Sequence, residues 1–430
     1  MRINKISLTN FRNIEHESFS FESNFTVIIG INGKGKSTLL HAIRIACGAY
    51  LLGIPETVKR HIWPNEIRRK DFGTHLALQT PTIVEAEGSI DNKNLIIPWR
   101  RIIPEGKAKN SATFVDIGQI RSIAKFKYDQ VTKEGKNVDN PVIAFFGTSR
   151  LSGGGRDTLS NYTGREIFKA GYNNWLEMKQ STYQYPKWLK AYDYRVKDKR
   201  EIKGTKEAFF EAIRTAVPFI TQLTFDGDDL VLKIKIEDFE SPFLPLNLHS
   251  DGIITHTSMV AELAYRCIML NAHHGKNAIK ESRGIVMIDE LDLHLHPTWQ
   301  KQVVLDLKNA FPNIQFVATT HSPFIVQSLK SEELINLDKL SDVEPVDLTL
   351  EEVAEDIMGV EDSYAIDNLK KEKISEDYLL ALEKLKDGDK DQNAVLDDLE
   401  IKISDPAMRA FLKMQRLENN VKGKKDASNT

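Results

Sequence analysis

Short, mostly apolar runs alternate along the chain with stretches of helical periodicity. The runs lie at residues 25–29, 142–146, 285–288 and 314–318, and such runs are typical of strands that are buried on both faces of a sheet. Directly after the first run, apolar side chains recur at helical spacing from residue 37 to about residue 52. The order strand, loop, helix, with further buried strands downstream, predicts an α/β protein.

Other segments predict antiparallel pairing and one long helix. Residues 82–103 have the pattern of short strands around a polar turn at 91–94, and residues 220–225 and 230–236 flank a turn of sequence Asp-Gly-Asp-Asp. Apolar periodicity then predicts an amphipathic helix from about residue 255 to residue 271. We therefore expect a side sheet next to the buried strands.

Two segments differ in composition from the rest. Residues 162–198 are rich in aromatic and basic side chains, and they follow a Ser-Gly-Gly-Gly stretch at 152–155 that indicates a domain transition. We interpret them as a short helical insertion whose aromatic rings either stack nucleic-acid bases or pack against the rest of the protein. The chain becomes acidic and helical in pattern after residue 340, and residues 422–430 are expected to be disordered.

Composition indicates an ordinary globular protein of two or three domains. Of 430 residues, 41% are hydrophobic and 28% are charged, and we find neither a run of about 18 apolar residues nor an export signal. A cytoplasmic location is expected. The net charge of −3 gives no overall attraction to nucleic acid. Cys47 and Cys267 lie within apolar helical patterns, which favours buried thiols over a disulfide or a metal site.

A glycine-rich turn links the first buried strand to the first helix. Its sequence, Gly30-Ile-Asn-Gly-Lys-Gly35-Lys36-Ser37-Thr38, fits the P-loop pattern in the strand and helix context that this motif requires. We expect it to bind the phosphates of ATP, with Lys36 reaching the β and γ phosphates and Ser37 coordinating Mg²⁺. A chance glycine turn is the alternative. The expected nucleotide-binding residues here are Asn32, Gly33, Lys34, Gly35, Lys36, Ser37 and Thr38.

The third buried run ends in two acids, Asp289 and Glu290. Carboxylates at the end of a buried strand are costly unless they serve a cation or a proton. We expect Asp289 to hold the Mg²⁺ shell and Glu290 to act as the base that activates water, since side chains alternate along a strand. Taken alone, the two acids have a simpler alternative explanation, namely solvent-exposed side chains at the end of a strand. Together with the P-loop, the pair is identified as a Walker B motif.

Histidines follow two of the buried runs. His321, just after the fourth run, is expected to lie at the same sheet edge as the P-loop and to sense the γ-phosphate; a surface histidine is the alternative. His294 and His296 are spaced i, i+2 after the Walker B acids, which suggests a metal site. No cysteine or further carboxylate cluster completes it, so we favour a loop that meets a second subunit.

The segment Leu248-His-Ser250-Asp251-Gly252 resembles the signature motif of ABC-type ATPases. In that family the serine and the glycine meet the γ-phosphate of a nucleotide bound to another protomer. The order P-loop, signature, Walker B, following aspartate (Asp292) and histidine completes the set. The resemblance therefore implies a composite site, shared by at least two chains, that includes Ser250, Gly252 and Asp292.

The motif set is similar to that of the SMC/RecF-type ATPases. Leu8-Thr-Asn-Phe11-Arg12-Asn13 resembles the N-terminal element that flanks the nucleotide in that group, which implies nucleotide contact by Arg12. The runs at 289–297 and 321–323 are most similar to the OLD-like bacterial defence ATPases, in particular the PtuA group of the Septu anti-phage systems. The resemblance covers residues 1–340 in pieces.

Two departures from these families limit what the resemblance implies. The insertion has no heptads, so the long coiled coil of SMC proteins is absent from the expected architecture. The acidic tail has no strand-borne Asp-x-Asp, so we do not expect the Toprim nuclease domain of OLD proteins. PtuA-type ATPases similarly lack a nuclease and work with an HNH-type nuclease subunit, which the helical tail could help to recruit.

We therefore expect an α/β fold: an ABC-type P-loop ATPase head with a mixed β-sheet core, an antiparallel side sheet, a short helical insertion and a C-terminal helical region. The expected divisions are a first head lobe, the insertion, a second head lobe and the C-terminal region, at residues 1–150, 151–204, 205–340 and 341–430.

The expected function is that of an ATPase in a bacterial anti-phage defence system, which binds ATP and Mg²⁺ between protomers and regulates or recruits a separate HNH-type nuclease. DNA contact would be direct or through that partner, and no membrane contact is expected. The alternatives are a non-hydrolysing, nucleotide-sensing scaffold and a RecF-like DNA repair ATPase.

Overall fold

The computed structural model describes the 430-residue chain apart from residues 56, 91–94, 107–116, 152–166, 198–201, 339–343, 361–373, 376, 383–389, 404–407 and 417–430. The chain divides into two compact units, Met1–Gly359 and Val360–Thr430. The first unit carries all the predicted motifs.

A five-stranded sheet forms the centre of the first unit, in the order β15-β3-β14-β13-β8, and each of its described pairings is parallel. Strands β3, β8, β13 and β14 are buried along their whole length, as their apolar runs predict. The bounds are Leu334–Asn336 (β15), Phe25–Ile29 (β3), Ile314–Thr319 (β14), Gly284–Ile288 (β13) and Val142–Phe146 (β8).

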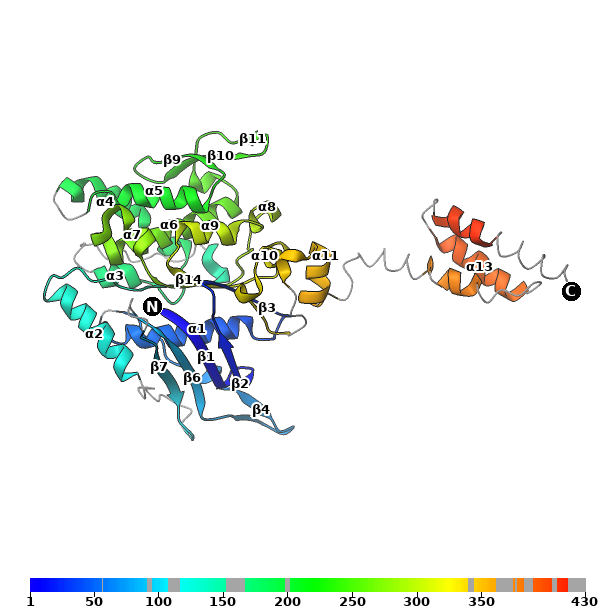
Figure 1. Cartoon of the computed structure of the whole chain (residues 1–430), viewed down its shortest axis with the longest axis horizontal. Helices are drawn as coiled ribbons and strands as arrows, with labels where there is room; N and C mark the ends of the chain where they lie inside the picture. The colour runs from blue at the N-terminus through cyan, green and yellow to red at the C-terminus, as the bar shows by residue number, and fades with distance from the viewer. Residues whose placement is uncertain are drawn as a thin grey trace. The chain divides into compact units, whose positions relative to one another are not determined.

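Helix α1 (Lys36–Leu51) lies between this core sheet and an antiparallel sheet of order β2-β1-β6-β7 (Figure 1). Because α1 is covered on both sides, nearly all of its residues are buried. The Trp99 indole nitrogen donates to the Ala46 carbonyl at 3.0 Å and joins the helix to the side sheet. The strands are Arg2–Phe11 (β1), Ile14–Ser20 (β2), Thr82–Ser89 (β6) and Ile97–Ile103 (β7).

Helix α6 (Asp251–Asn271) packs on the other face of the core sheet, against β8, α3 and α5 (Figure 1). It begins four residues earlier than its apolar periodicity predicts. This first turn combines an exposed Asp251 with a buried Gly252, so apolar periodicity does not report it. The neighbouring helices are Ile167–Tyr172 (α3), Thr205–Ala216 (α5) and Ala278–Glu281 (α7), and Val303–Ala310 (α9) packs against α5.

The aromatic side chains of the predicted insertion pack into the first unit. Trp175 and Trp188 are fully buried, and the Trp188 ring contacts the rings of Phe209 and Tyr265 at 5.3 and 6.0 Å. The packing alternative is therefore confirmed for these rings, and base stacking is wrong for them. Tyr194 of helix α4 (Tyr185–Lys197) is exposed. The other buried aromatics among the described residues of the segment are Phe168, Tyr172, Tyr183, Tyr185 and Tyr192.

Smaller elements complete the first unit. The predicted hairpin is confirmed as β9 (Ile220–Phe225) and β10 (Leu230–Ile236), which are antiparallel. The remaining strands and α-helices described in this unit are β4 (Arg69–Asp71), β5 (Leu76–Leu78), β11 (Phe239–Glu240), β12 (Leu244–Pro245), α2 (Gly118–Thr132), α8 (Pro297–Gln300), α10 (Pro323–Gln327) and α11 (Leu350–Glu352).

The first unit extends to Gly359, whereas the C-terminal region expected from the sequence starts at residue 341. Val353 and Ile357 are buried and join the core of the first unit. The described part of the second unit is helical, including α13 (Lys390–Lys402), and has a small core of its own. That core consists of Tyr378, Leu382, Leu396, Ile403 and Leu412.

The predicted α/β class and the antiparallel side sheet are confirmed, and the core sheet, which was expected to be mixed, is parallel in each of its described pairings. Within the described residues, no helix is both long and apolar enough to cross a membrane. Cys47 and Cys267 are buried free thiols, as predicted, and burial raises the pKa of both.

Candidate functional site

Three adjacent strands of the core sheet end at one cavity. Strands β3, β14 and β13 are parallel neighbours, with Ile28 opposite Thr319 and Ile288 opposite Ala318, so the segments that follow them meet at the carboxyl edge of the sheet. The cavity there has a volume of about 380 Å³. It is lined by Arg12, Asn13, Asn32, Gly33, Gly35, Lys36, Ser37, Thr38, Asp289, Glu290, Thr319 and His321.

The P-loop has the backbone that phosphate binding requires. Gly33 and Gly35 have φ values of +90° and +116°, in the left-handed region that favours glycine. Gly35 is the N-cap residue of α1, so the first turn of the helix follows it directly. The Lys36 ammonium donates to the carbonyls of Gly30 at 2.5 Å and Ile31 at 3.3 Å. Burial lowers the pKa of Lys36, which adds to the benefit of an anionic partner here.

Ser37 and Asp289 meet across the cavity. The Ser37 hydroxyl lies 3.3 and 3.5 Å from the two carboxylate oxygens of Asp289. The Thr319 hydroxyl donates to Asp289 at 2.6 Å and accepts from the backbone N–H of Glu290 at 2.8 Å. Hydroxyl and carboxylate oxygens are the ligands that a hard divalent cation prefers, so this pair fits such a cation, and the Thr319 hydrogen bond orients the Asp289 carboxylate.

Glu290 has a strained backbone that its neighbours hold in place. Its φ is +53°, a left-handed value that costs a non-glycine residue about 1 kcal/mol or more. The buried Arg150 guanidinium donates to the carbonyls of Asp289 at 2.7 Å and Glu290 at 2.6 Å, and burial lowers the pKa of Arg150. The left-handed turn directs the chain away from the strand immediately after the acid, and the Glu290 side chain lines the cavity.

Asp292 orients the histidine segment. Its carboxylate accepts from the Thr320 hydroxyl at 2.5 Å and from the backbone N–H of His321 at 3.3 Å. His321 lines the cavity, whereas Asp292 does not. In this chain Asp292 therefore contributes indirectly, by fixing the backbone of His321, which lines the cavity.

The N-terminal element contributes two residues to the lining of the cavity: Arg12, which was predicted, and Asn13, which was not. Glu66 holds Arg12 by two hydrogen bonds. Its backbone carbonyl accepts from the Arg12 backbone N–H at 2.7 Å, and its carboxylate accepts from the Arg12 guanidinium at 3.0 Å. Asn13 joins the element to the P-loop, because its amide donates to the Gly33 carbonyl at 3.1 Å and accepts from the Thr38 hydroxyl at 3.0 Å. Asn13 directly follows Arg12 in the N-terminal motif at residues 8–13, and that position is a sequence signal from which its contact with the P-loop was predictable.

Lys34 points to a different partner. Its ammonium lies 3.4 Å from the carboxylate of Asp338, which also accepts from the Ile31 backbone N–H at 2.7 Å. Lys34 is not among the residues that line the cavity. The contact anchors the P-loop to the segment after β15.

The signature residues lie outside the cavity of their own chain. Ser250 is exposed at the N-cap position of α6 and makes no side-chain capping bond. Gly252 is buried, and a Cβ atom there would lie 2.2 Å from the carbonyl oxygen of His294. The glycine thus allows α6 to approach the loop after Walker B. In that loop, His296 caps α8 by accepting from the Thr298 backbone N–H at 3.3 Å.

Comparison with known proteins gives matches over most of the chain. A family model described as "AAA domain" matches residues 5–238, and one described as "AAA domain, putative AbiEii toxin, Type IV TA system" matches residues 276–327. The Septu protein PtuA of Bacillus thuringiensis is 25% identical over 84% of this chain and 85% of its own length. The Retron Vc95 probable ATPase of Vibrio cholerae is 25% identical over 79% of this chain and 74% of its own. The SMC head domain from Thermotoga maritima has a TM-score of 0.43 at 16% identity, over 80% of this chain and 97% of that one.

Gly252→Ala is expected to destabilise the protein by about 1–3 kcal/mol, because the new Cβ atom meets a backbone carbonyl that cannot rotate away. Denaturant unfolding measures the loss. Gly118→Ala at the start of α2 is the matched control, since a Cβ atom there has open space around it and the change is expected to be neutral or slightly stabilising. Equal stability of the two variants would contradict the close contact between α6 and the His294 loop.

Proposed function

The chain belongs to the AAA-domain family, as an SMC/RecF-like ABC-type ATPase related to PtuA, and we propose that it is the ATP-hydrolysing subunit of a bacterial anti-phage defence system. The observation that carries this proposal is the convergence of the P-loop, two acids and a histidine on one cavity at the carboxyl edge of the core sheet. Each group has the chemistry that one step of nucleotide binding or hydrolysis requires.

ATP binding uses groups that already point into the cavity. The triphosphate would lie along the P-loop, with backbone N–H groups and the start of α1 facing its negative charge. Lys36 would exchange its two carbonyl partners for the β and γ phosphates. Asn13 and Thr38 keep the loop in shape through their mutual hydrogen bond, and Arg12 adds positive charge at the rim.

Ser37 and Asp289 would hold Mg²⁺, which supplies positive charge to the developing negative charge on the phosphates. The fit rests on their oxygen donors, which already approach within 3.3 Å. Thr319 fixes one carboxylate oxygen of Asp289 by a hydrogen bond of 2.6 Å. The other carboxylate oxygen is then directed toward the Ser37 hydroxyl.

Hydrolysis would use Glu290 as the base for the attacking water and His321 as the γ-phosphate sensor. The Glu290 backbone is held from both sides, by Thr319 at its N–H and by Arg150 at its carbonyl. A rigid base of this kind lowers the barrier because no rearrangement is needed during the reaction. Asp292 similarly fixes the backbone of His321.

The catalytic site would be completed by a second copy of the chain. Ser250 is exposed at the start of α6 with its hydroxyl uncommitted to capping, and it does not line the cavity of its own chain. Backbone N–H groups and a hydroxyl at a helix start suit a phosphate. In a dimer, Ser250 and the nearby Gly252 backbone would face the γ-phosphate bound by the partner.

The defence role draws on relatives whose names are Septu protein PtuA and retron probable ATPase, each aligned over most of its length. The described residues of the head carry a nucleotide cavity and no predicted nuclease motif, so the effector would be a separate nuclease, which we propose to be of the HNH type. The helical second unit, with its own small core, is the candidate docking element.

Lys36→Ala is expected to weaken ATP binding by about 10- to 100-fold or more, because it removes charge-assisted hydrogen bonds worth about 1.5–3 kcal/mol each. Isothermal titration with ATP and Mg²⁺ measures the loss. In a host that carries the complete defence system, the same variant should lose protection against phage. Lys280→Ala is the control, since this exposed lysine forms a surface ion pair with Glu211 and does not line the cavity. Tight ATP binding by Lys36→Ala would overturn the P-loop assignment.

Mixing two inactive variants tests the shared site. Lys36→Ala disables the P-loop and Ser250→Arg blocks the signature, so each alone should lack turnover, while a mixed dimer contains one intact composite site. The mixture should therefore regain measurable ATP turnover. Asn247→Arg, at a neighbouring exposed position, controls for the added charge. Full activity of Ser250→Arg alone, or no regain on mixing, would contradict a site shared between chains.

A further inference from the structure

One aspartate and two histidines meet at the edge of the core sheet opposite the nucleotide cavity. Asp139 shortly precedes β8, and His273 and His274 lie in the 3₁₀ turn Ala272–Asn277 that follows α6. Because the core strands are parallel, the start of β8 and the nucleotide cavity lie at opposite edges of the sheet. The three residues therefore form a cluster that the ATPase chemistry does not use.

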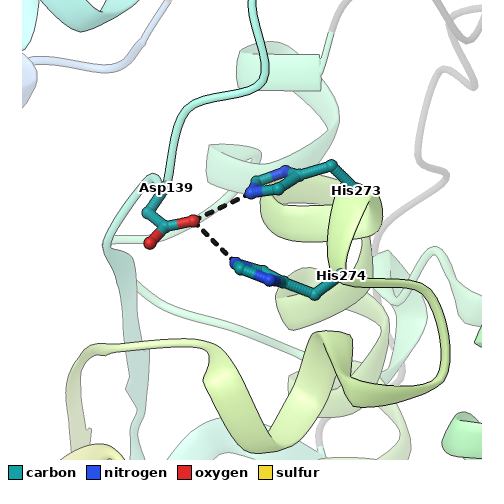
Figure 2. A group of neighbouring side chains, drawn as sticks. All are labelled: Asp139, His273 and His274. Carbon is teal, nitrogen blue, oxygen red and sulfur yellow. Dashed lines mark hydrogen bonds and ion pairs between the residues drawn. The ribbon is translucent and has the colours of Figure 1, made fainter.

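Both imidazole rings are directed at one carboxylate oxygen (Figure 2). The Nε2 atoms of His273 and His274 lie 2.8 and 2.7 Å from Oδ1 of Asp139, and the ring centroids are 4.2 Å apart. The three candidate ligand atoms all lie within 4.8 Å of one another. Two nitrogens and one oxygen thus converge on a single point.

Hydrogen bonds hold the backbone on both sides of the cluster. Asn140 and Asn271 form a buried reciprocal pair, in which the Asn140 N–H donates to the Asn271 side chain at 2.8 Å and the Asn271 amide donates to the Asn140 carbonyl at 3.0 Å. Asn271 also donates to the Ser282 hydroxyl at 2.9 Å. The Lys127 ammonium donates to the main-chain carbonyl of Asp139 at 2.9 Å. The segments that carry the three side chains are therefore preorganised.

We propose that Asp139, His273 and His274 bind one Zn²⁺ ion. Imidazole nitrogen and carboxylate oxygen are donors that zinc accepts, and three protein ligands leave a fourth position for water. Zinc–nitrogen bonds of about 2.0 Å separate neighbouring tetrahedral donors by about 3.3 Å. The two nitrogen-to-oxygen contacts would open by about 0.5 Å around the ion, and the side chain of Asp139 is 53% exposed, which leaves it room to shift.

Without a metal, two neutral imidazoles can each donate an Nε2–H hydrogen bond to the shared Asp139 oxygen. Zinc binding would replace these hydrogen bonds, and the proton on each Nε2 would move to Nδ1 or be released to solvent. The ion would fasten the loop before β8 to the end of α6, the helix whose start carries Ser250.

The test uses the full chain, stripped of metal with a chelator and kept free of nucleotide. Zn²⁺ is titrated in competition with a chromophoric chelator, and protein-bound zinc is counted by elemental analysis after desalting. The wild type is expected to retain one zinc ion per chain. His273→Gln with His274→Gln should lose it, and Asp139→Asn should bind it more weakly. His16→Gln with His75→Gln removes two other exposed histidines and should still retain the ion.

Circular dichroism checks that each variant is folded, and zinc should raise the thermal unfolding temperature of the wild type and of the control only. Two outcomes overturn the proposal. One is a wild-type protein that retains no zinc. The other is equal zinc retention by the wild type and the His273, His274 and Asp139 variants, which would mean that any binding is elsewhere, for example at Asp289 and Glu290.

Discussion

The parallel alignment of β3, β14 and β13 is the constraint on which the nucleotide site depends. Each strand delivers a different chemical group to the same edge: the glycine-rich loop after β3, the acids after β13 and the histidine after β14. Because neighbouring parallel strands lie about 5 Å apart, groups that are distant in sequence come within reach of one ligand. The strands are buried on both faces, so their register is set by the core between α1 and α6.

A second layer of hydrogen bonds converts this convergence into fixed geometry. Thr319 bonds to both Walker B residues, Arg150 holds the carbonyls of the same pair, and Asp292 holds His321. These partners hold Glu290 in a left-handed backbone conformation that non-glycine residues rarely adopt. Strain of this kind, held by several buried contacts, is typical of preorganised catalytic sites.

Local patterns in the sequence predicted the strands and the candidate residues because motif and element coincide there. Each apolar run ended within one residue of the end of its strand. The candidate residues that follow β3, β13 and β14 line the cavity, apart from Lys34 and Asp292. Arg150 could not be predicted in its role, because it reaches Asp289 across 139 positions of chain. Asp139 and His273, 134 positions apart, have no common motif either. Such contacts depend on the tertiary fold, and periodicity does not report them.

The central claim is that this cavity binds and hydrolyses ATP with Glu290 as base. Steady-state hydrolysis by the wild type and Glu290→Gln, measured together with native mass in ATP and Mg²⁺, tests it most directly. The account predicts wild-type turnover, a fall of about 10²- to 10⁴-fold in the variant, and an ATP-dependent oligomer that the variant retains. Unchanged turnover in Glu290→Gln would contradict the base assignment, and an ATP-dependent mass without wild-type turnover would identify a nucleotide-sensing scaffold instead.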